Sequence, residues 1–246
     1  MTKLRFLSGN AVKIIGAIAM LFDHMGLLLF PDIIFFRIVG RLAFPIFAFM
    51  ISEGAKYTKN RLRYFLTVFG VGALCQLPYS FIIRDLHLNT FLTFSLSIIV
   101  IYSLDFFKRA LFAKDCDIAV KVFTFLVFIG AFALMYIMTS IVPYIHFDYG
   151  LYGCLMPIFA SIPCIHNTAA PSWLKRLDTL PTRILCMLAP VLVYCHSAGG
   201  VQYYALISML ILLLYSGKRG RANMKYFFYI FYPAHIVVLS ALSIIF

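Results

Sequence analysis

Two polar residues inside the first hydrophobic segment are the strongest candidates for chemistry. Lys13 and His24 both lie in the apolar run from Ala11 to Phe30. On an α-helix their spacing is about three turns, so both side chains project from one face, roughly 16 Å apart along the axis. An ionisable group inside a membrane helix is costly, so it normally faces protein or water and has a function. Histidine there can act as a general base, because imidazole titrates near neutral pH.

Other charged residues lie close to His24 in the sequence. Arg37 and Arg41 are one turn apart on one face of the second hydrophobic segment. Arg41 either stabilises a developing oxyanion or pairs with a carboxylate such as Asp23, whereas Arg37 is more simply a side chain that snorkels to the surface. Asp23 projects about 100° away from His24 on a helix, so it need not orient the imidazole. A buried imidazole with nearby cations is suited to acyl transfer, and the alternative is a structural histidine bonded to backbone.

The composition places these residues in membrane helices. Of the 246 residues, 63% are hydrophobic and 12% are charged, and the mean hydropathy is +0.95. A soluble domain has apolar residues nearer half and charged residues nearer a quarter. Apolar runs about 20 residues long recur from start to finish, which predicts an all-α, polytopic membrane protein that forms one domain over residues 1–246.

Hydropathy and turn signals predict nine spans, or ten if a boundary is misplaced. The expected spans are at about 11–30, 33–52, 64–83, 90–107, 119–141, 149–166, 182–197, 200–215 and 226–245. The seventh and eighth are short, so they can also form a single re-entrant pair.

The basic residues orient these spans. The formal net charge is +12, and all 21 Lys and Arg residues except Lys13, Arg37, Arg41 and Arg84 fall before residue 6 or in alternate segments near 56–63, 108–121, 175–183 and 218–225. Positive charge between spans marks cytoplasmic loops, so we expect a multi-pass membrane protein with its N-terminus in the cytoplasm. Cations spread in this way do not form the basic stripe of a nucleic-acid-binding surface.

The inner cations are candidate ligands for phosphate. Lys13 lies near the cytoplasmic face, and Lys218 and Arg219 lie in a glycine-rich loop. Both sites can bind the phosphates of a CoA donor. Lys13 can equally snorkel to anionic lipid, and a positive-inside loop needs no ligand.

Further polar residues occur in or beside later spans. His235 follows Pro233 in the last span and either binds substrate, supports His24 or packs at a proline kink. Gln76 and Asn89 either line the same cavity or join helices by hydrogen bonds. Tyr149 opens the sixth span from the outer side. The remaining histidines and the six cysteines form no metal-binding motif, so no metal is expected.

Several short motifs resemble a known family when they are taken in order. They are Asp23-His24-Met-Gly, Gly40-Arg41-Leu-Ala-Phe-Pro45, Glu53-Gly54, Gln76-Leu-Pro-Tyr79, Asn89-Thr-Phe-Leu-Thr93, Tyr149-Gly150, Gly217-Lys-Arg-Gly220 and Phe231-Tyr-Pro-Ala-His235. The set resembles the TraX family, whose namesake is implicated in N-terminal acetylation of conjugative F-pilin. The resemblance extends over nearly the whole chain.

The TraX family is similar in turn to the acyltransferase type 3 group of membrane enzymes. That group has a basic residue, ten intervening residues and a histidine in its first helix, and Lys13 and His24 match this pattern. The resemblance implies that His24 is the general base and that acetyl-CoA is the cytoplasmic donor. It implies a location in the bacterial plasma (inner) membrane and a protein N-terminus as acceptor, and an envelope glycan is an equally credible acceptor.

Two functions from other classes stay open. A transporter also builds its site from polar residues in broken membrane helices, although the hydropathy shows no inverted repeat. A membrane assembly factor without chemistry would need no catalytic histidine.

Overall fold

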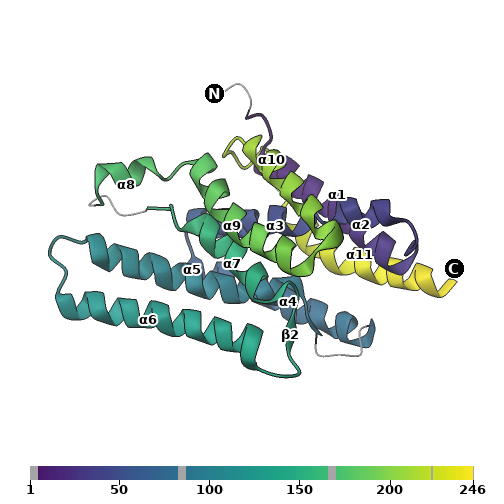
Figure 1. The fold of residues 1–246 in the computed structure, drawn as a ribbon, viewed down its shortest axis with the longest axis horizontal. Helices are drawn as coiled ribbons and strands as arrows, with labels where there is room; N and C mark the ends of the chain where they lie inside the picture. The colour runs from purple at the N-terminus through teal and green to yellow at the C-terminus, as the bar shows by residue number, and fades with distance from the viewer. Residues whose placement is uncertain (1–4, 83–86, 166–169, 223, 246) are drawn as a thin grey trace.

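The computed structural model of the chain describes residues 5–82, 87–165, 170–222 and 224–245, and these residues are mainly helical (Figure 1). The α-helices are α1 (Gly9–Leu28), α2 (Ile34–Gly40), α3 (Ala43–Tyr57), α4 (Arg61–Ile82), α5 (Thr90–Phe112), α6 (Ile118–Tyr136), α7 (Gly150–Ser161), α8 (Ser172–Arg176), α9 (Leu180–Ala198), α10 (Ile207–Leu213) and α11 (Lys225–Ile245). A π-helical segment, η2 (Ile137–Ile141), follows α6, and a 3-10 helix, η3 (Gly200–Leu206), precedes α10. The predicted all-α class is confirmed for the described residues.

Two very short strands connect the loops at one end of the bundle. β1 (His87–Leu88) pairs in parallel with β2 (His146–Phe147). The backbone N–H of Asp148 then donates to the carbonyl of Leu88 at 2.9 Å. The pairing ties the loop before α5 to the loop before α7.

Six segments of the described chain are long and apolar enough to cross a membrane. They are Gly9–Leu28, Ile34–Tyr57, Thr90–Phe112, Ile118–Ile141, Leu180–Ala198 and Tyr226–Ile245. The other expected spans, at 64–83, 149–166 and 200–215, coincide with α4, α7 and η3–α10. Helix α7 has 12 residues and is therefore about 18 Å long, against roughly 30 Å of hydrocarbon. The structure thus shows six apolar segments of membrane-spanning length among the described residues. It does not show the nine or ten spans that the sequence predicts.

Proline explains the interruption in the second apolar segment. Helix α2 ends at Gly40, and α3 begins at Ala43 with Pro45 in its first turn. Proline has no N–H to donate to the carbonyl four residues earlier, but it is tolerated in a first turn. The break falls at Arg41 and Leu42, between the two helices.

Helices α1 and α11 lie side by side and run in the same direction. The ammonium of Lys13 is 5.8 Å from the ring centre of Phe228, and His24 meets His235 further along both helices. At the start of α1, the N–H of Gly9 donates to the carbonyl of Lys218 at 2.7 Å. The two helices therefore begin at the same end of the molecule, and Lys13 and His24 share one face as predicted.

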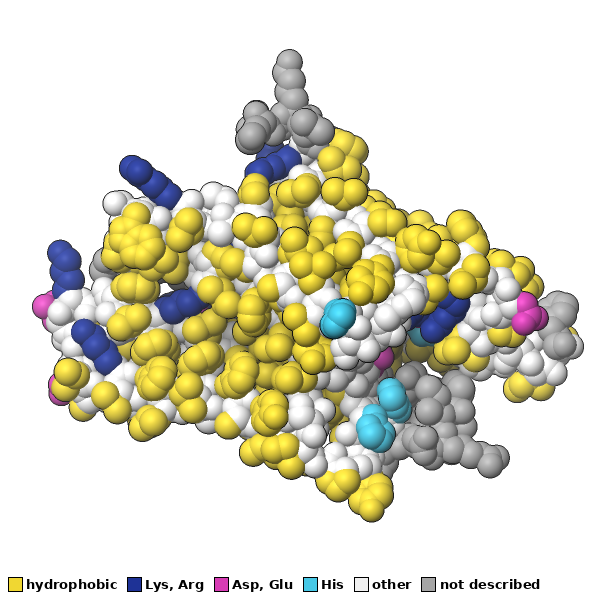
Figure 2. Space-filling model, viewed as in Figure 1, with side chains coloured by type: hydrophobic (Ala, Val, Ile, Leu, Met, Phe, Trp, Pro, Cys, Tyr) yellow, Lys and Arg dark blue, Asp and Glu magenta, His cyan; other side chains and the backbone are white. Residues whose placement is uncertain are grey.

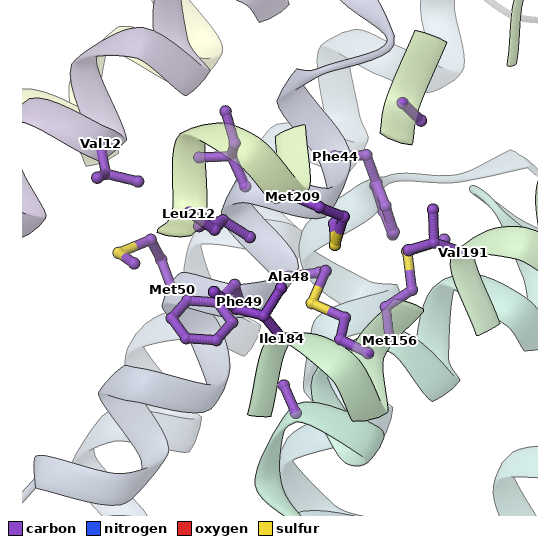
Figure 3. Close-up of a cluster of buried hydrophobic side chains, with 14 of the residues drawn as sticks. Val12, Phe44, Ala48, Phe49, Met50, Met156, Ile184, Val191, Met209 and Leu212 are labelled. Atoms are coloured by element: carbon purple, nitrogen blue, oxygen red, sulfur yellow. The ribbon is translucent and has the colours of Figure 1, made fainter. Parts of the chain in front are cut away.

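The core lies where α3 crosses α1, α7, α9 and α10 (Figure 3). Phe49 is fully buried near its centre, among Ala48, Met156, Ile184 and Leu212. Helix α6 is different, because only 11% of its most apolar stretch is buried. Apolar packing on the inner helices and an apolar outer surface are what a helix bundle in lipid requires.

The ends of the bundle differ in charge. In Figure 1 the α5–α6 turn and α8 lie at the left, and the α1–α2 turn and the end of α11 lie at the right. Figure 2 shows most of the Lys and Arg side chains of this face over the left half and hydrophobic side chains along the flank. The loops that are predicted to be cytoplasmic from their positive charge thus lie toward the same end of the bundle. Lys3 and Arg84 lie outside the described residues.

Candidate functional site

A pair of histidines from the first and last apolar helices forms the centre of the candidate site. Nδ1 of His24 and Nε2 of His235 are 2.8 Å apart, which is a hydrogen-bond distance. The other ring nitrogen of His235, Nδ1, is 2.8 Å from the carbonyl oxygen of Phe231. His235 is 6% exposed, and His24 is partly accessible. The structure thus brings together two histidines that the sequence placed in separate spans.

A cluster of charges lies beside this pair. The same carboxylate oxygen of Asp23 forms an ion pair with Arg41 and lies 3.0 Å from Nη1 of Arg37. Arg37 also donates to the backbone carbonyl of Asp23, and Nε of Arg41 donates to the carbonyl of Arg37, each at 3.2 Å. Asp23 is therefore held by arginines, which agrees with its expected direction away from His24. Of the two alternatives for Arg41, the structure shows the carboxylate pair.

A cavity of 560 Å³ runs between α1, α3, α4, α5 and α11. Its charged lining residues are Lys13, Glu53 and Arg219. Aromatic side chains form a large part of the rest: Phe47, Tyr57, Tyr64, Phe91, Phe94, Tyr215, Phe228, Tyr229, Phe231 and Tyr232. A pocket that is largely apolar with a few convergent polar groups is typical of a small-molecule site.

The histidine pair lies just beyond the cavity lining. Met20 and Phe231 line the cavity, and each precedes one of the histidines by one helical turn. The ring of Phe231 stacks on His235 at 5.0 Å, and the ring of Tyr232 approaches it edge-on at 5.8 Å. A ligand in the cavity would therefore meet these aromatic side chains before it reached the histidines.

The inner cations occupy different positions. Lys13 lines the cavity and, among the described residues, forms no ion pair. Arg219 also lines the cavity, at the loop that docks on the start of α1. Lys218 is exposed and contributes its backbone carbonyl to that docking. The structure thus brings Lys13 and Arg219 into the cavity and leaves the side chain of Lys218 at the surface.

A buried ion pair at the edge of the cavity was not predicted from the sequence. Arg183 pairs with one carboxylate oxygen of Glu53, and the hydroxyl of Tyr215 donates to the other at 2.8 Å. Arg183 also donates to Ser52 and to the carbonyl of Ala160, each at 3.0 Å. The sequence analysis grouped Arg183 with the basic residues of a cytoplasmic segment, and the structure places it in the first turn of α9, where it is 3% exposed. An intramembrane carboxylate such as Glu53 was the available signal, since such a group needs a partner.

Gln76 and Asn89 hold two helices together. The Asn89 amide nitrogen donates to the carbonyl of Gly72 at 2.7 Å and to the side-chain oxygen of Gln76 at 3.0 Å. Gln76 donates in turn to the carbonyl of His87 at 2.8 Å. Asn89 is fully buried, and neither residue lines the cavity. These bonds join α4 to the start of α5. Of the two alternatives for Gln76 and Asn89, the structure therefore shows the one in which they link helices by hydrogen bonds.

Tyr149 also lies away from the cavity. It has a left-handed backbone (φ 61°) before α7, and its ring stacks on Phe44 at 3.7 Å. The adjacent Asp148 accepts from the hydroxyl of Thr90, which does line the cavity. Burial raises the pKa of the Asp148 carboxyl above its ordinary value, and the Thr90 hydrogen bond opposes this shift. Tyr149 thus packs at the base of α7, and Thr90 is the link from that region to the cavity.

The described residues show no arrangement that would hold a metal ion. No group of three or more His, Cys, Asp or Glu side chains gathers among them. The rings of His87 and His146 are 6.0 Å apart, across the β1–β2 pair. Two imidazoles at that spacing, without a third ligand, do not form a zinc site.

Comparison with known proteins gives a match over almost the whole chain. The family described as "TraX protein" matches residues 8–243. A probable fimbrial assembly protein FimC (serogroup H1) of Dichelobacter nodosus is 28% identical over 95% of this chain and 95% of its own length. An uncharacterized protein of Rickettsia prowazekii (strain Madrid E) is 37% identical over 25% of this chain and 24% of its own. No solved structure matches the chain. With the family matched from the first helix to the last, the chain belongs to the TraX family.

Proposed function

We propose that this protein is a membrane-embedded acyltransferase that moves acetyl from cytoplasmic acetyl-CoA to an acceptor on the outer side. The observation that carries the proposal is the His24–His235 pair one turn beyond a cavity with cations in its lining. His24 is the general base. A positioned base of this kind contributes about 10²–10⁴-fold to a transfer reaction.

The cavity suits the donor in charge and shape. Arg183 and Tyr215 occupy both oxygens of Glu53, so Lys13 and Arg219 give the lining an excess of positive charge. Phosphates of CoA would lie near these two cations. From there to His24 is roughly 16 Å along α1, which is of the order of the extended pantetheine arm. The thioester would then lie at the His24 end of the cavity, where Met20 is part of the lining.

Each residue of the proposed site has its own role in the transfer reaction. His24 takes the proton of the acceptor amine or hydroxyl as the acceptor attacks the thioester carbonyl. The carbon–sulfur bond breaks, and the proton on His24 passes to the departing CoA thiolate. Arg37 and Arg41 share the single carboxylate of Asp23, so this trio keeps a net positive charge near the developing oxyanion. In this proposal Gln76, Asn89 and Tyr149 support the fold around the site, and Lys218 supports the cavity loop.

Two classes of acceptor are proposed for the acetyl group. The name of the Dichelobacter relative concerns fimbrial assembly, and pilin acetylation is the activity that the family resemblance implies. We therefore propose the amino group of an exported pilin-like subunit as the first acceptor. A hydroxyl of an envelope glycan is the second, because His24 could deprotonate either group.

A second candidate function is a membrane assembly factor without catalysis. The observation that favours it is the name of the Dichelobacter relative, which mentions assembly and no transfer reaction. Intact-mass analysis of exported proteins and envelope glycans, with and without the gene, separates the two. If the protein is an acyltransferase, at least one exported protein or envelope glycan should lack an acetyl group in cells without the gene. Unchanged masses with defective pilus or fimbria assembly would establish the second function instead.

The proposal includes a location in the bacterial plasma membrane with a cytoplasmic N-terminus. Reporter fusions after Tyr57 and after Lys218 should report the cytoplasm, and a fusion after His87 should report the outer side. The reason is that the basic loops lie at one end of the bundle and stay in the cytoplasm. Fusions with the reverse pattern would place the donor cavity on the wrong side for cytoplasmic acetyl-CoA.

Donor binding gives a further prediction. Lys13→Gln should weaken acetyl-CoA binding by about 10- to 100-fold, since one charge-assisted hydrogen bond to phosphate is worth about 1.5–3 kcal/mol. Thermal-shift titration of the purified protein in detergent measures the affinity. Lys59→Gln is the matched control, because Lys59 is exposed and outside the cavity. If acetyl-CoA stabilises neither the wild-type protein nor the control, the cavity does not take this donor.

A further inference from the structure

The two hydrogen bonds of His235 fix which nitrogen of each ring carries the proton. The carbonyl oxygen of Phe231 can only accept, so Nδ1 of His235, 2.8 Å away, is the donor. A neutral imidazole carries one N–H, so Nε2 of His235 has a lone pair. This nitrogen is 2.8 Å from Nδ1 of His24, which must therefore donate to it. The remaining nitrogen of His24, Nε2, is left unprotonated.

We propose that His235 is a positioning residue that holds His24 in its Nδ1–H tautomer, so that Nε2 of His24 is the atom that takes the acceptor proton. The inference rests on the proposed acyltransferase function and assigns the reacting atom within it. In serine hydrolases a carboxylate does the same for the catalytic histidine. Here a neutral imidazole replaces it, which avoids placing a further charge inside the bundle.

The proton then moves along a defined line. When Nε2 of His24 takes the acceptor proton, the ring becomes an imidazolium with N–H groups on both nitrogens. Its Nδ1–H continues to donate to His235, whose lone pair stabilises the new charge. His24 then gives the Nε2 proton to the CoA thiolate and returns to its starting tautomer. His235 keeps its own proton throughout, because the Phe231 carbonyl holds it.

The surroundings keep His235 in this orientation. Its ring is covered by Phe231, with the two planes 11° apart, and by the edge of Tyr232. The residue is 6% exposed. The nearby charges, on Asp23, Arg37 and Arg41, are tied to one another. The described hydrogen-bond partners of the His24 ring are His235 and the backbone at Met20, one turn earlier on α1.

A matched pair of substitutions tests the role. His235→Gln keeps an acceptor oxygen near the position of Nε2, whereas His235→Met has nearly the same length and no comparable acceptor. We expect His235→Met to lower kcat for transfer of labelled acetyl from acetyl-CoA to envelope material by about 10²-fold, with an unchanged KM for acetyl-CoA. His235→Gln should remain within about tenfold of the wild type. His196→Met, at an exposed histidine, is the control.

The tautomer itself can be read without any activity. Nitrogen NMR of histidine-labelled protein, assigned by loss of the His24 signals in His24→Ala, should show His24 protonated on Nδ1 in the wild type and in His235→Gln. In His235→Met this preference should be lost. A His24 ring protonated on Nε2 in the wild type, or equal kcat for His235→Met and the wild type, overturns the positioning role. Loss of transfer in His24→Ala alongside full activity in His235→Met would leave the acyltransferase function intact. If the wild-type protein transfers no acetyl, the proposed acyltransferase function is wrong. The NMR measurement would still determine the tautomer of His24 in that case.

Discussion

His24→Ala should insert, fold and bind acetyl-CoA as the wild-type protein does, yet lose acetyl transfer by a factor of about 10²–10⁴. The fold should tolerate the change because a single polar side chain contributes little to the stability of a membrane interior. The partner left behind, His235, keeps its bond to Phe231. The transfer rate of purified protein in lipid, with acetyl-CoA at saturation, is the measurement.

His196→Ala is the control for that result, since His196 is an exposed histidine at the end of α9. It should transfer at the wild-type rate. A folded His24→Ala protein that also does so would move the base elsewhere, with His235 the next candidate. The spacing of Lys13 and His24 would then be a matter of helix packing alone.

The largest expected effect on stability is at the buried ion pair. Arg183→Met should destabilise the protein by about 3–5 kcal/mol, because it leaves the carboxylate of Glu53 buried without its cation. The change also removes the bonds of Arg183 to Ser52 and to the Ala160 carbonyl at the end of α7. The midpoint of thermal unfolding in detergent should fall well below that of the wild type.

Two variants isolate the cause of that loss. The double change Glu53→Gln with Arg183→Met should recover part of the stability, since no uncompensated charge remains. Arg176→Met, at an exposed arginine on α8, should leave the midpoint unchanged. If Arg183→Met and Arg176→Met unfold at the same temperature, the Glu53–Arg183 pair does not stabilise the fold.

Local pattern predicted much of the fold. Apolar runs identified helices at each of the nine expected places, and the eleven-residue spacing put Lys13 and His24 on one face. The span count was harder, because α7 and η3–α10 are short and α4 begins with Arg61 and Arg63. Hydropathy alone does not distinguish a short buried helix from a span when neighbouring helices supply the rest of its environment.

Pairings between distant residues were not predictable. His24 and His235 are separated by 211 positions and Glu53 and Arg183 by 130, and nothing in either local sequence specifies the partner. The carboxylate partner for Arg41 was one of two alternatives, and Asp23 proved to be shared with Arg37. Side-chain direction on a helix limits such choices, but only the packing of α1 against α2 and α11 decides them.

The central claim, vectorial acetyl transfer at His24, is tested most directly in inside-out membrane vesicles. These expose the basic loops to the medium, where labelled acetyl-CoA is added, and enclose the outer-side acceptor. We predict label in the enclosed envelope material, at background level with His24→Ala and unchanged with His196→Ala. If wild-type vesicles take up no more label than vesicles from cells without the gene, the protein is not an acetyl-CoA-dependent acyltransferase.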